Sequence, residues 1–387
     1  MNILLDFIPF QSATGIGGAQ SFTKAVCDEV CLRRSAQDKL FATYNSTLPH
    51  GRQYNYEEYA HQNDIQLLDI SHTPIRVHIN TFHIDVFFIA IAQFYARYSL
   101  DNIQCKVVMG IHDIWDVESD DNKVELTIHD RFVENNLIWL KRIADTVLGR
   151  YNRRQHRIYQ HLMPLYTADN TIAYTVSNYT RNALKYYFPE LSKKKIHVFY
   201  SSARQVTQSP EIESKELIRL INSGKKYLFM VAANRRQKNA KTLKKVYLRL
   251  LNDFPDLHLL TLKYGHTVHP NHIDIDFLSD SDMQHAYSNA LVLVFGSFFE
   301  GFGYPPVEAM RYGTPTAASN VTSIPEILGD AAIYFSPFYP ADMYKAIRQI
   351  LDDPKCIESQ IRKRYVEVTN RQKDDLNRLT SEIFRIP

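Results

Sequence analysis

Short apolar runs separated by amphipathic stretches recur along the whole chain of 387 residues. In the first half these runs are MNILLDF, IQLLDI, VFFIAIA, CKVVMGI, TIAYTV and KKKIHVFY. Unbroken apolar strands are typical of parallel sheets, which are buried on both faces and need a crossing helix between successive strands. The pattern therefore predicts an α/β fold with parallel sheets.

The alternation stops once and then starts again. Residues 201–216, SSARQVTQSPEIESKE, are polar and without a period, which is typical of an interdomain linker. The runs that follow are KKYLFMVAA, LHLLTLKYG, HIDIDFLS, LVLVFGS, TPTAAS and AIYFSP. Because the βαβ pattern occurs on both sides of the linker, we expect two Rossmann-like domains, 1–203 and 204–365. Residues 366–387 have helical apolar spacing and many charges.

Residues 291–330 carry the densest set of signals. The strand LVLVFGS leads into the loop FFEGFGY, in which Gly301 and Gly303 permit a sharp turn and a close approach by a ligand. Pro305 and Pro306 follow, preset for the first turn of a helix, and Gly313 predicts its end. A helix start offers free N–H groups and partial positive charge to a phosphate.

Two acids flank this turn, Glu300 at the end of the strand and Glu308 one turn into the helix. Carboxylates here can accept hydrogen bonds from sugar hydroxyls while the backbone holds an anion. The combination favours a nucleotide sugar as the ligand. Farther on, SIPE predicts a capping box between Ser323 and Glu326.

The run EGFGYPPVEAMRYGTPTAASNVTSIPEILGDAA resembles the signature of the retaining glycosyltransferases of family 4, the glycosyl transferases group 1, bacterial surface-polysaccharide type. The resemblance is strong over about residues 225–350 and weaker over 1–202. It implies a GT-B fold, with two facing Rossmann-like domains, an active site in the cleft between them, and a C-terminal helix that returns to the first domain. It also implies that Glu300 contacts the transferred sugar and Glu308 the ribose, with Gly301, Phe302 and Gly303 beside the donor.

The loop after the first strand is also rich in glycine. Gly15, Gly17 and Gly18 precede a helix expected over residues 20–33. GIGGAQ lacks the spacing of a dehydrogenase fingerprint, so a simple strand-to-helix turn is the alternative. In the family this loop faces donor and acceptor, often with Arg where Gly18 stands here.

A histidine and an aspartate follow the strand KVVMGI. His112 and Asp113 stand where open α/β sheets place their ligand sites. The resemblance implies that His112 approaches the reacting sugar. Asp113 either takes part or caps the following turn.

Basic residues follow the first strand of the second domain, in AANRRQKNAKTL. Arg235, Arg236 and Lys238 can meet a diphosphate, the arginines with a planar fork and the lysine with a mobile point charge. The family has Arg-Lys-Asn where this chain has Gln237-Lys238-Asn239, so Lys238 matches. Which arginine replaces the missing one is left open between Arg235 and Arg236.

The sequence offers no metal motif. The acidic pairs 274/276, 280/282 and 120/121 lack the flanking context of a metal-binding DxD. We expect no cofactor and no metal, with Lys238 and an arginine supplying the charge that a leaving diphosphate needs.

Composition narrows the remaining possibilities. A formal net charge of +3 is too small to indicate nucleic acid. The four cysteines form no ligand pattern and are expected to be reduced packing residues. With neither a signal peptide nor an apolar run of about 20 residues, the chain is predicted to be cytoplasmic. The basic segment 141–157 either lies near an anionic membrane or an acceptor diphosphate, or is a solvated helix face.

The resemblance thus implies a retaining hexosyltransferase that acts on a saccharide acceptor, lipid-linked, in O-antigen, capsule or exopolysaccharide synthesis, and the absence of a metal motif predicts that it is metal-independent. The resemblance also favours mannose from GDP-mannose as the donor. Two alternatives stand beside it, a GT-B nucleotide-sugar epimerase or hydrolase and a non-catalytic nucleotide-binding partner.

Overall fold

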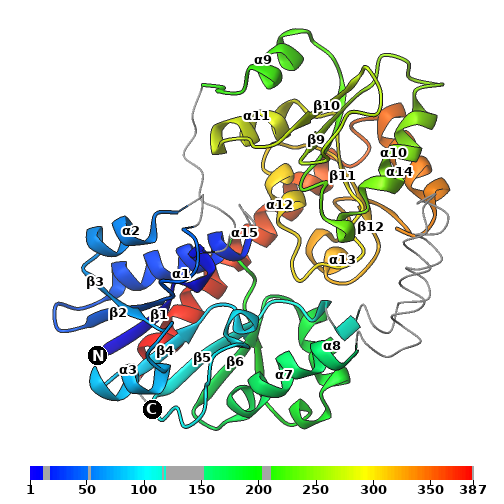
Figure 1. Cartoon of the computed structure of the whole chain (residues 1–387). Helices are drawn as coiled ribbons and strands as arrows, with labels where there is room; N and C mark the ends of the chain where they lie inside the picture. The colour runs from blue at the N-terminus through cyan, green and yellow to red at the C-terminus, as the bar shows by residue number, and fades with distance from the viewer. Residues whose placement is uncertain (12–17, 51–53, 116, 119–151, 203–210, 386–387) are drawn as a thin grey trace. The chain divides into compact units, whose positions relative to one another are not determined.

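The computed structural model describes residues 1–11, 18–50, 54–115, 117–118, 152–202 and 211–385 (Figure 1). They form two compact units. The first contains the described residues of 1–120, 148–204 and 371–387, and the second those of 205–370. The first unit is thus assembled from segments at both ends of the chain.

The first unit is built on a seven-stranded sheet in the order β3-β2-β1-β4-β5-β6-β7. Every neighbouring pair of strands is parallel, as the apolar runs predicted. The strands are β1 (Asn2–Asp6), β2 (Lys39–Tyr44), β3 (Ile65–Asp69), β4 (Val86–Ile89), β5 (Lys106–Ile111), β6 (Thr171–Thr175) and β7 (Ile196–Val198). The sequence analysis named no strand between residues 34 and 64, where the structure places β2.

Helices cover both faces of this sheet because successive residues of each strand point to opposite sides. Leu4 of β1 belongs to one apolar cluster, which α3, α7 and α8 cover. Ile3 and Leu5 belong to the other, under α1, α2 and the end of α15. The helices of the unit are α1 (Gly18–Arg33), α2 (Tyr56–Gln62), α3 (Ile75–Thr81), α7 (Asn152–Thr167) and α8 (Asn178–Tyr187), with the short 3-10 turns η1 (Ile8–Gln11), η2 (Ala92–Tyr95) and η3 (Pro189–Leu191).

The second unit repeats the design with a six-stranded sheet in the order β10-β9-β8-β11-β12-β13. Its strand pairs are all parallel as well. The strands are β8 (Tyr227–Met230), β9 (His258–Leu262), β10 (His272–Ile275), β11 (Val292–Phe295), β12 (Thr316–Ser319) and β13 (Ile333–Phe335). Each lies within one of the runs that the sequence analysis assigned to a strand.

Two layers of helices again enclose the sheet. Residues of α10 and α14 pack on one face, and residues of α9, α11 and α12 on the other. The helices are α9 (Lys215–Asn222), α10 (Ala240–Leu250), α11 (Asp280–Asn289), α12 (Tyr304–Met310), α13 (Ile324–Leu328) and α14 (Pro340–Asp352), with η4 (Arg236–Lys238) between β8 and α10. The helix predicted after Pro305 ends at Met310, and Gly313 lies beyond it with a φ of 73°.

Each sheet has one strand at which the order of connections reverses. In the first unit β1 lies between β2 and β4, and in the second β8 lies between β9 and β11. The loops that leave β1 and β4, and those that leave β8 and β11, therefore turn away from each other. Ligands of open α/β sheets bind in the crevice that such a reversal opens at the carboxyl ends of the strands.

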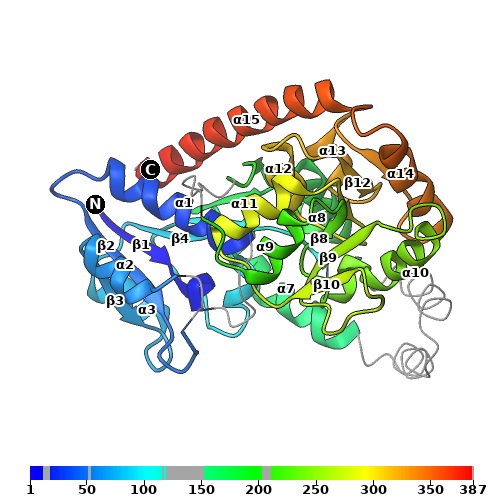
Figure 2. The ribbon, with the colours of Figure 1, turned by 90° about the horizontal axis from the view of Figure 1, so that it is seen from above.

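The last helix, α15 (Glu358–Phe384), has 27 residues and contributes to both units. Near its start, the Arg364 guanidinium donates to the carbonyls of Glu326 and Ile327 in the second unit. Near its end it lies beside α1 (Figure 2), where Arg33 donates to the Asn377 side chain. Lys106 of β5 donates to the carbonyls of Glu382 and Arg385 and so caps the helix.

Candidate active site

An ion pair joins the two loops that diverge in the second unit. The Lys238 ammonium, in the loop after β8, donates to a carboxylate oxygen of Glu300, in the loop after β11. The side chains are only 11% and 14% exposed, and the ammonium lies 4.9 Å from the centre of the Phe295 ring. Two residues that the sequence analysis selected separately therefore form one charged site at the reversal point of the sheet.

Backbone contacts fix the Glu300 loop. The Phe298 N–H donates to the Gln237 carbonyl at 2.8 Å, which joins the two loops beside the ion pair. The Glu300 N–H donates to the Thr322 hydroxyl at 3.1 Å. Thr322 has a φ of 52°, which costs a β-branched residue about 1–3 kcal/mol. The sequence analysis did not select Thr322.

Ser323 corrects one prediction. Its hydroxyl donates to the carbonyls of Glu300, at 2.9 Å, and Phe302, at 3.3 Å, and makes no cap hydrogen bond to α13. The predicted capping box with Glu326 is therefore wrong. A helix does begin after Ser323, as predicted, but the serine hydroxyl donates to carbonyls of the neighbouring loop and not to the helix backbone.

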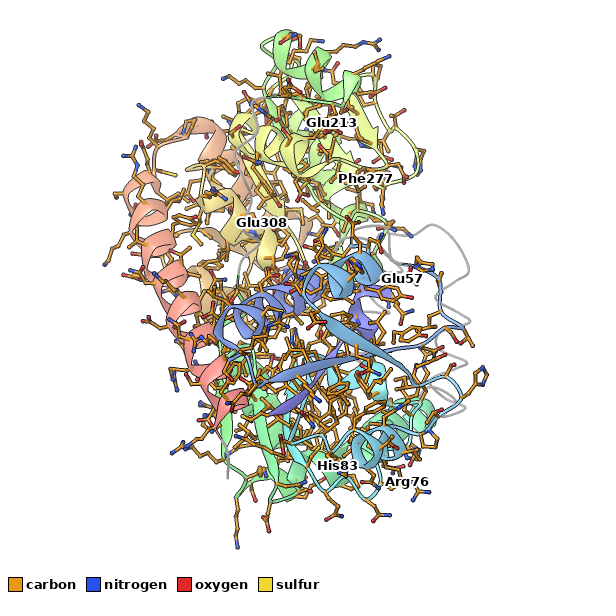
Figure 3. All side chains as sticks on the ribbon, turned by 90° about the vertical axis from the view of Figure 1, so that its left-hand side faces the viewer. Glu57, Arg76, His83, Glu213, Phe277 and Glu308 are labelled. Atoms are coloured by element: carbon orange, nitrogen blue, oxygen red, sulfur yellow. The ribbon has the colours of Figure 1, made fainter. Side chains whose placement is uncertain are left out.

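Glu308 is held by a tyrosine. It lies on α12 (labelled in Figure 3), and its Oε2 accepts a hydrogen bond from Tyr287 of α11 at 2.7 Å. Gly303 precedes α12 with a φ of 96°, a conformation that favours glycine, and so allows the chain to turn from Glu300 into the helix. Phe302, between them, is 3% exposed and packs on Tyr304, whereas Gly301 is half-buried.

The basic loop after β8 is a short 3-10 turn. The Lys238 N–H donates to the Arg235 carbonyl at 2.9 Å, so the backbone of η4 sets where Lys238 points. Arg235 is half-buried and Arg236 exposed. Of the two, Arg235 lies nearer the protein interior, but the choice between them for a diphosphate remains a prediction.

In the first unit, His112 lies just beyond β5 and is buried. The Phe22 ring of α1 packs against it edge-on, with centroids 5.1 Å apart. Burial lowers its pKa to about 4, against an opposing hydrogen bond with the Ala90 backbone. The imidazole is therefore neutral near pH 7. Asp113 accepts from the Trp115 N–H at 3.2 Å, as a turn cap does.

A buried aspartate fixes the backbone next to His112. Asp6, at the end of β1, accepts hydrogen bonds from the N–H groups of Ile8, Ala90 and Ile91 and from the Tyr95 hydroxyl. Burial raises its pKa to about 7, although all four donors oppose this shift. In the sequence, Asp6 is only a single polar residue within the apolar run MNILLDFIPF, which gives no signal for this role.

The Ala90 carbonyl, like its N–H, forms a hydrogen bond with a buried side chain. It accepts from the Tyr174 hydroxyl at 3.2 Å. Tyr174 reaches it across Gly110, where a Cβ atom would lie 2.3 Å from the tyrosine ring. The peptide that contacts His112 is thus fixed from both sides.

Other predicted site residues lie at the edge of the described structure or outside it. Gly18 is the first residue of α1, whereas Gly15 and Gly17 lie outside the described residues. Most of the basic segment 141–157 lies outside them as well.

The described residues contain no group of three or more His, Cys, Asp or Glu side chains placed to hold a metal ion. Two of the candidate acids have structural roles. Asp274 accepts from Thr261 and from the N–H groups of Tyr264 and Gly265, and Asp282 forms a capping box with Ser279 at the start of α11. The four cysteines are free thiols.

The sequence of the second unit matches a known family. Residues 211–369 match the model described as "Glycosyl transferases group 1". Over this region, which is less than half of the chain, the protein is similar to the glycosyl transferases group 1. The matched region contains Lys238, Glu300 and Glu308, and so both the ion pair and the Tyr287–Glu308 contact.

Parts of the chain are similar to bacterial proteins described as mannosyltransferases. The O-antigen chain mannosyltransferase RfbU of Salmonella typhimurium is 28% identical over 201 residues, which are 48% of this chain and 52% of that protein. The serotype-specific mannosyltransferase WbdA of Escherichia coli is 42% identical over 77 residues, 20% of this chain and 9% of WbdA. The matches thus span about half of RfbU and about a tenth of WbdA.

The solved structure of WaaG, described as a glycosyltransferase involved in lipopolysaccharide biosynthesis, matches with a TM-score of 0.66 at 12% identity. The match covers 99% of each chain. At this identity the likeness concerns the fold, and it confirms the GT-B architecture of two parallel-sheet α/β domains.

Proposed function

We propose that this protein is a retaining hexosyltransferase that moves a sugar from a nucleotide sugar to a saccharide acceptor. The observation that carries the proposal is the Lys238–Glu300 ion pair, on the two diverging loops of the group 1 domain. It places a cation for a diphosphate next to a carboxylate for sugar hydroxyls.

In this reaction the bond between the anomeric carbon and the diphosphate oxygen breaks, and a bond to the acceptor oxygen forms on the same face of the sugar. Lys238, with Arg235 or Arg236, would neutralise the charge on the departing diphosphate without a metal. Glu300 would orient the sugar and Glu308 the ribose. The proton of the acceptor hydroxyl would pass to an oxygen of the leaving diphosphate.

Mannose from GDP-mannose is the donor we favour, because RfbU and WbdA are both described as mannosyltransferases. For the same reason we favour a lipid-linked saccharide of O-antigen, capsule or exopolysaccharide synthesis as the acceptor. No described helix is long and apolar enough to cross a membrane. We propose that such an acceptor is met at the cytoplasmic face of the membrane, with the basic segment 141–157 as the contact.

The first test is a thermal-shift screen without metal against GDP, UDP, dTDP and ADP and their common hexose conjugates. A ligand that binds only the native state raises the melting temperature, so the donor should produce a selective shift together with its nucleotide. Absence of any shift would contradict the proposal.

The selected donor is then incubated alone and with oligosaccharide acceptors, and the products are analysed by NMR. Transfer with the anomeric configuration of the donor retained is the expected result. Conversion of the donor without any acceptor would instead indicate an epimerase or a hydrolase.

A further inference from the structure

Several buried side-chain atoms of the first unit have no hydrogen-bond partner among the described residues, and two of the acceptors belong to residues just beyond β4 and β5. They are Nε2 of His112 and Oε1 of Gln93, and neither has a hydrogen-bond partner among the described residues. A buried polar atom left in this way costs about 1–3 kcal/mol, so its presence in a folded protein needs an explanation.

Their neighbours determine the chemical character of both atoms. Gln93 donates its amide N–H to the Asp113 carbonyl at 2.6 Å, so its unpartnered atom is the carbonyl oxygen. His112 is neutral near pH 7 and uses its other ring nitrogen toward the Ala90 backbone, which leaves a lone pair on Nε2. Both atoms therefore accept hydrogen bonds and donate none.

The two residues lie at one place in the fold. His112 follows β5, and Gln93 lies in η2 after β4, the strand paired with β5. The Gln93 amide binds the carbonyl of Asp113, the residue next to His112. Both residues thus lie at the carboxyl edge of the sheet, where α/β proteins bind their ligands. Gln93 itself is half-buried, at the boundary between core and surface.

The missing partner is therefore a donor without net charge. Two neutral acceptors do not bind an anion, because neither atom can donate a hydrogen bond to it. They also carry no negative charge with which to balance a cation. Hydroxyl groups of a pyranose meet the requirement, since each has an O–H to donate and one ring carries several of them.

We propose that Gln93 and His112 together accept hydrogen bonds from the hydroxyls of a pyranose, and that Gln93 thereby selects which sugar is used. This rests on the proposed hexosyltransferase function, and it adds Gln93 as a specificity-determining residue. The pyranose is either the hexose of the donor or the terminal sugar of the acceptor. Both present the same chemistry. A site built to bind a hydroxyl discriminates against an analogue that lacks it.

The test compares full-length wild type with Gln93→Met against two series of ligands. One series is GDP-mannose and its monodeoxymannose analogues, with UDP-glucose and its monodeoxy analogues used instead if the screen selects UDP. The other is methyl α-D-mannopyranoside and its monodeoxy analogues, with the nucleotide present. Dissociation constants are measured by calorimetry for every ligand.

In wild type, loss of one particular hydroxyl should weaken binding by about tenfold, and in Gln93→Met the parent and that deoxy analogue should bind equally well. The series in which this occurs identifies the donor sugar or the acceptor sugar as the occupant. Affinity for the nucleotide without a sugar should be the same in both proteins.

Asn170→Leu is the matched control. Asn170 also donates its side-chain amide to backbone carbonyls, those of Ile103 and Cys105, but at the opposite edge of the same sheet. It should leave discrimination between the sugars unchanged even if it lowers stability.

The inference is overturned if Gln93→Met keeps the wild-type discrimination against every deoxy analogue in both series. An internal water on the two acceptors would give this result. If wild type binds no nucleotide sugar at all, the proposed function fails first, and this inference fails with it.

Discussion

At the scale of single residues, the candidate site depends on charges whose partners lie far apart in the sequence. Lys238 and Glu300 are 62 positions apart, yet they are the pair that joins the two diverging loops. Glu300 was selected from the sequence by the glycines that follow it, and Lys238 by its basic cluster and its match to the family pattern. Their contact was not predictable, because it depends on how β8 and β11 lie side by side in the sheet.

The ion pair predicts opposite effects of two substitutions on nucleotide binding. Lys238→Met removes the cation and should weaken GDP binding by about tenfold or more, because hydrogen bonds to charged groups contribute about 1.5–3 kcal/mol. Glu300→Gln removes the counter-ion instead, so Lys238 becomes fully available and GDP should bind as well as in wild type or better. Calorimetry with GDP measures both effects.

Transfer should nevertheless fall in both variants, by about a hundredfold or more, since each loses a group that acts on the reacting sugar or the leaving group. Arg348→Met is a suitable control, because it breaks an exposed ion pair with Asp253. Equal weakening of GDP binding in Lys238→Met and Glu300→Gln would show that the pair is a structural contact only.

Asp6 and His112 predict a specific dependence of stability on pH. The pKa of Asp6 is raised from 3.8 to about 7, so its contribution to stability is complete below pH 3.8 and is lost as pH rises through 7. The pKa of His112 is lowered from 6.5 to about 4, so its contribution is complete above pH 6.5 and is lost as pH falls through 4. Between pH 4 and 6.5 the two contributions oppose each other.

When one of the two groups is replaced, the pH dependence of stability that the other contributes should therefore no longer be offset. Compared with wild type, the free energy of unfolding of Asp6→Asn should rise more steeply with pH, and that of His112→Gln less steeply, by at most about 1.4 kcal/mol per pH unit. Urea unfolding at several pH values measures the slopes. Curves that run parallel to wild type would show that neither group titrates differently in the folded protein.

At the scale of elements, the sequence was most informative where burial alone decides the structure. LVLVFGS was identified as β11 because a strand buried on both faces must be apolar throughout. KLFATY, which forms β2, was not predicted to be a strand. SIPE was predicted to form a capping box, because local spacing carries no information about the neighbouring loop. The Ser323 hydroxyl binds the Glu300 carbonyl, a contact that only the folded chain creates.

The attachment of α15 to the first unit can be tested at one residue. Asp375 is 2% exposed, accepts the Tyr200 N–H at 2.9 Å and pairs with Arg371 and Arg378. The two arginines are largely exposed, so most of its effect should come from the buried N–H. Asp375→Ala should lower the free energy of unfolding by about 1–3 kcal/mol, measured by urea denaturation.

Glu367→Ala on the same helix is the control, since its ion pairs with Lys363 and Arg364 are exposed and should contribute less than about 1 kcal/mol. If the two variants lose the same small amount of stability, the Asp375 contacts do not stabilise the packing of α15 on the first unit.

At the scale of the whole molecule, the sequence predicted two Rossmann-like domains, and the structure has two parallel-sheet units. The linker was recognisable because the βαβ pattern stopped and restarted. The region that matches the group 1 model contains Glu300, Glu308 and Lys238, the residues that the sequence motifs selected. The proposed role of Gln93 was not predictable, because Gln93 belongs to no motif and is brought next to the His112–Asp113 segment only by the fold.

Charge neutralisation by fixed cations predicts that the reaction proceeds without a metal. Transfer from the selected nucleotide sugar should be unchanged after dialysis against EDTA, because in the proposed mechanism Lys238 and a neighbouring arginine stabilise the leaving diphosphate. Initial rates before and after chelation measure this. Loss of activity that Mg²⁺ or Mn²⁺ restores would contradict it.

The first unit consists of chain segments that lie before and after the second unit in the sequence, and this affects the order in which the units can fold during synthesis. Its strands are synthesised before the second unit, but Leu379 and Ile383, which complete the apolar layer over β1 and α1, are translated only after the whole second unit. The second unit, by contrast, has its described residues in one continuous stretch. On the ribosome, the first unit should therefore be completed after the second, and until the end of α15 emerges its uncovered apolar layer would need protection from aggregation.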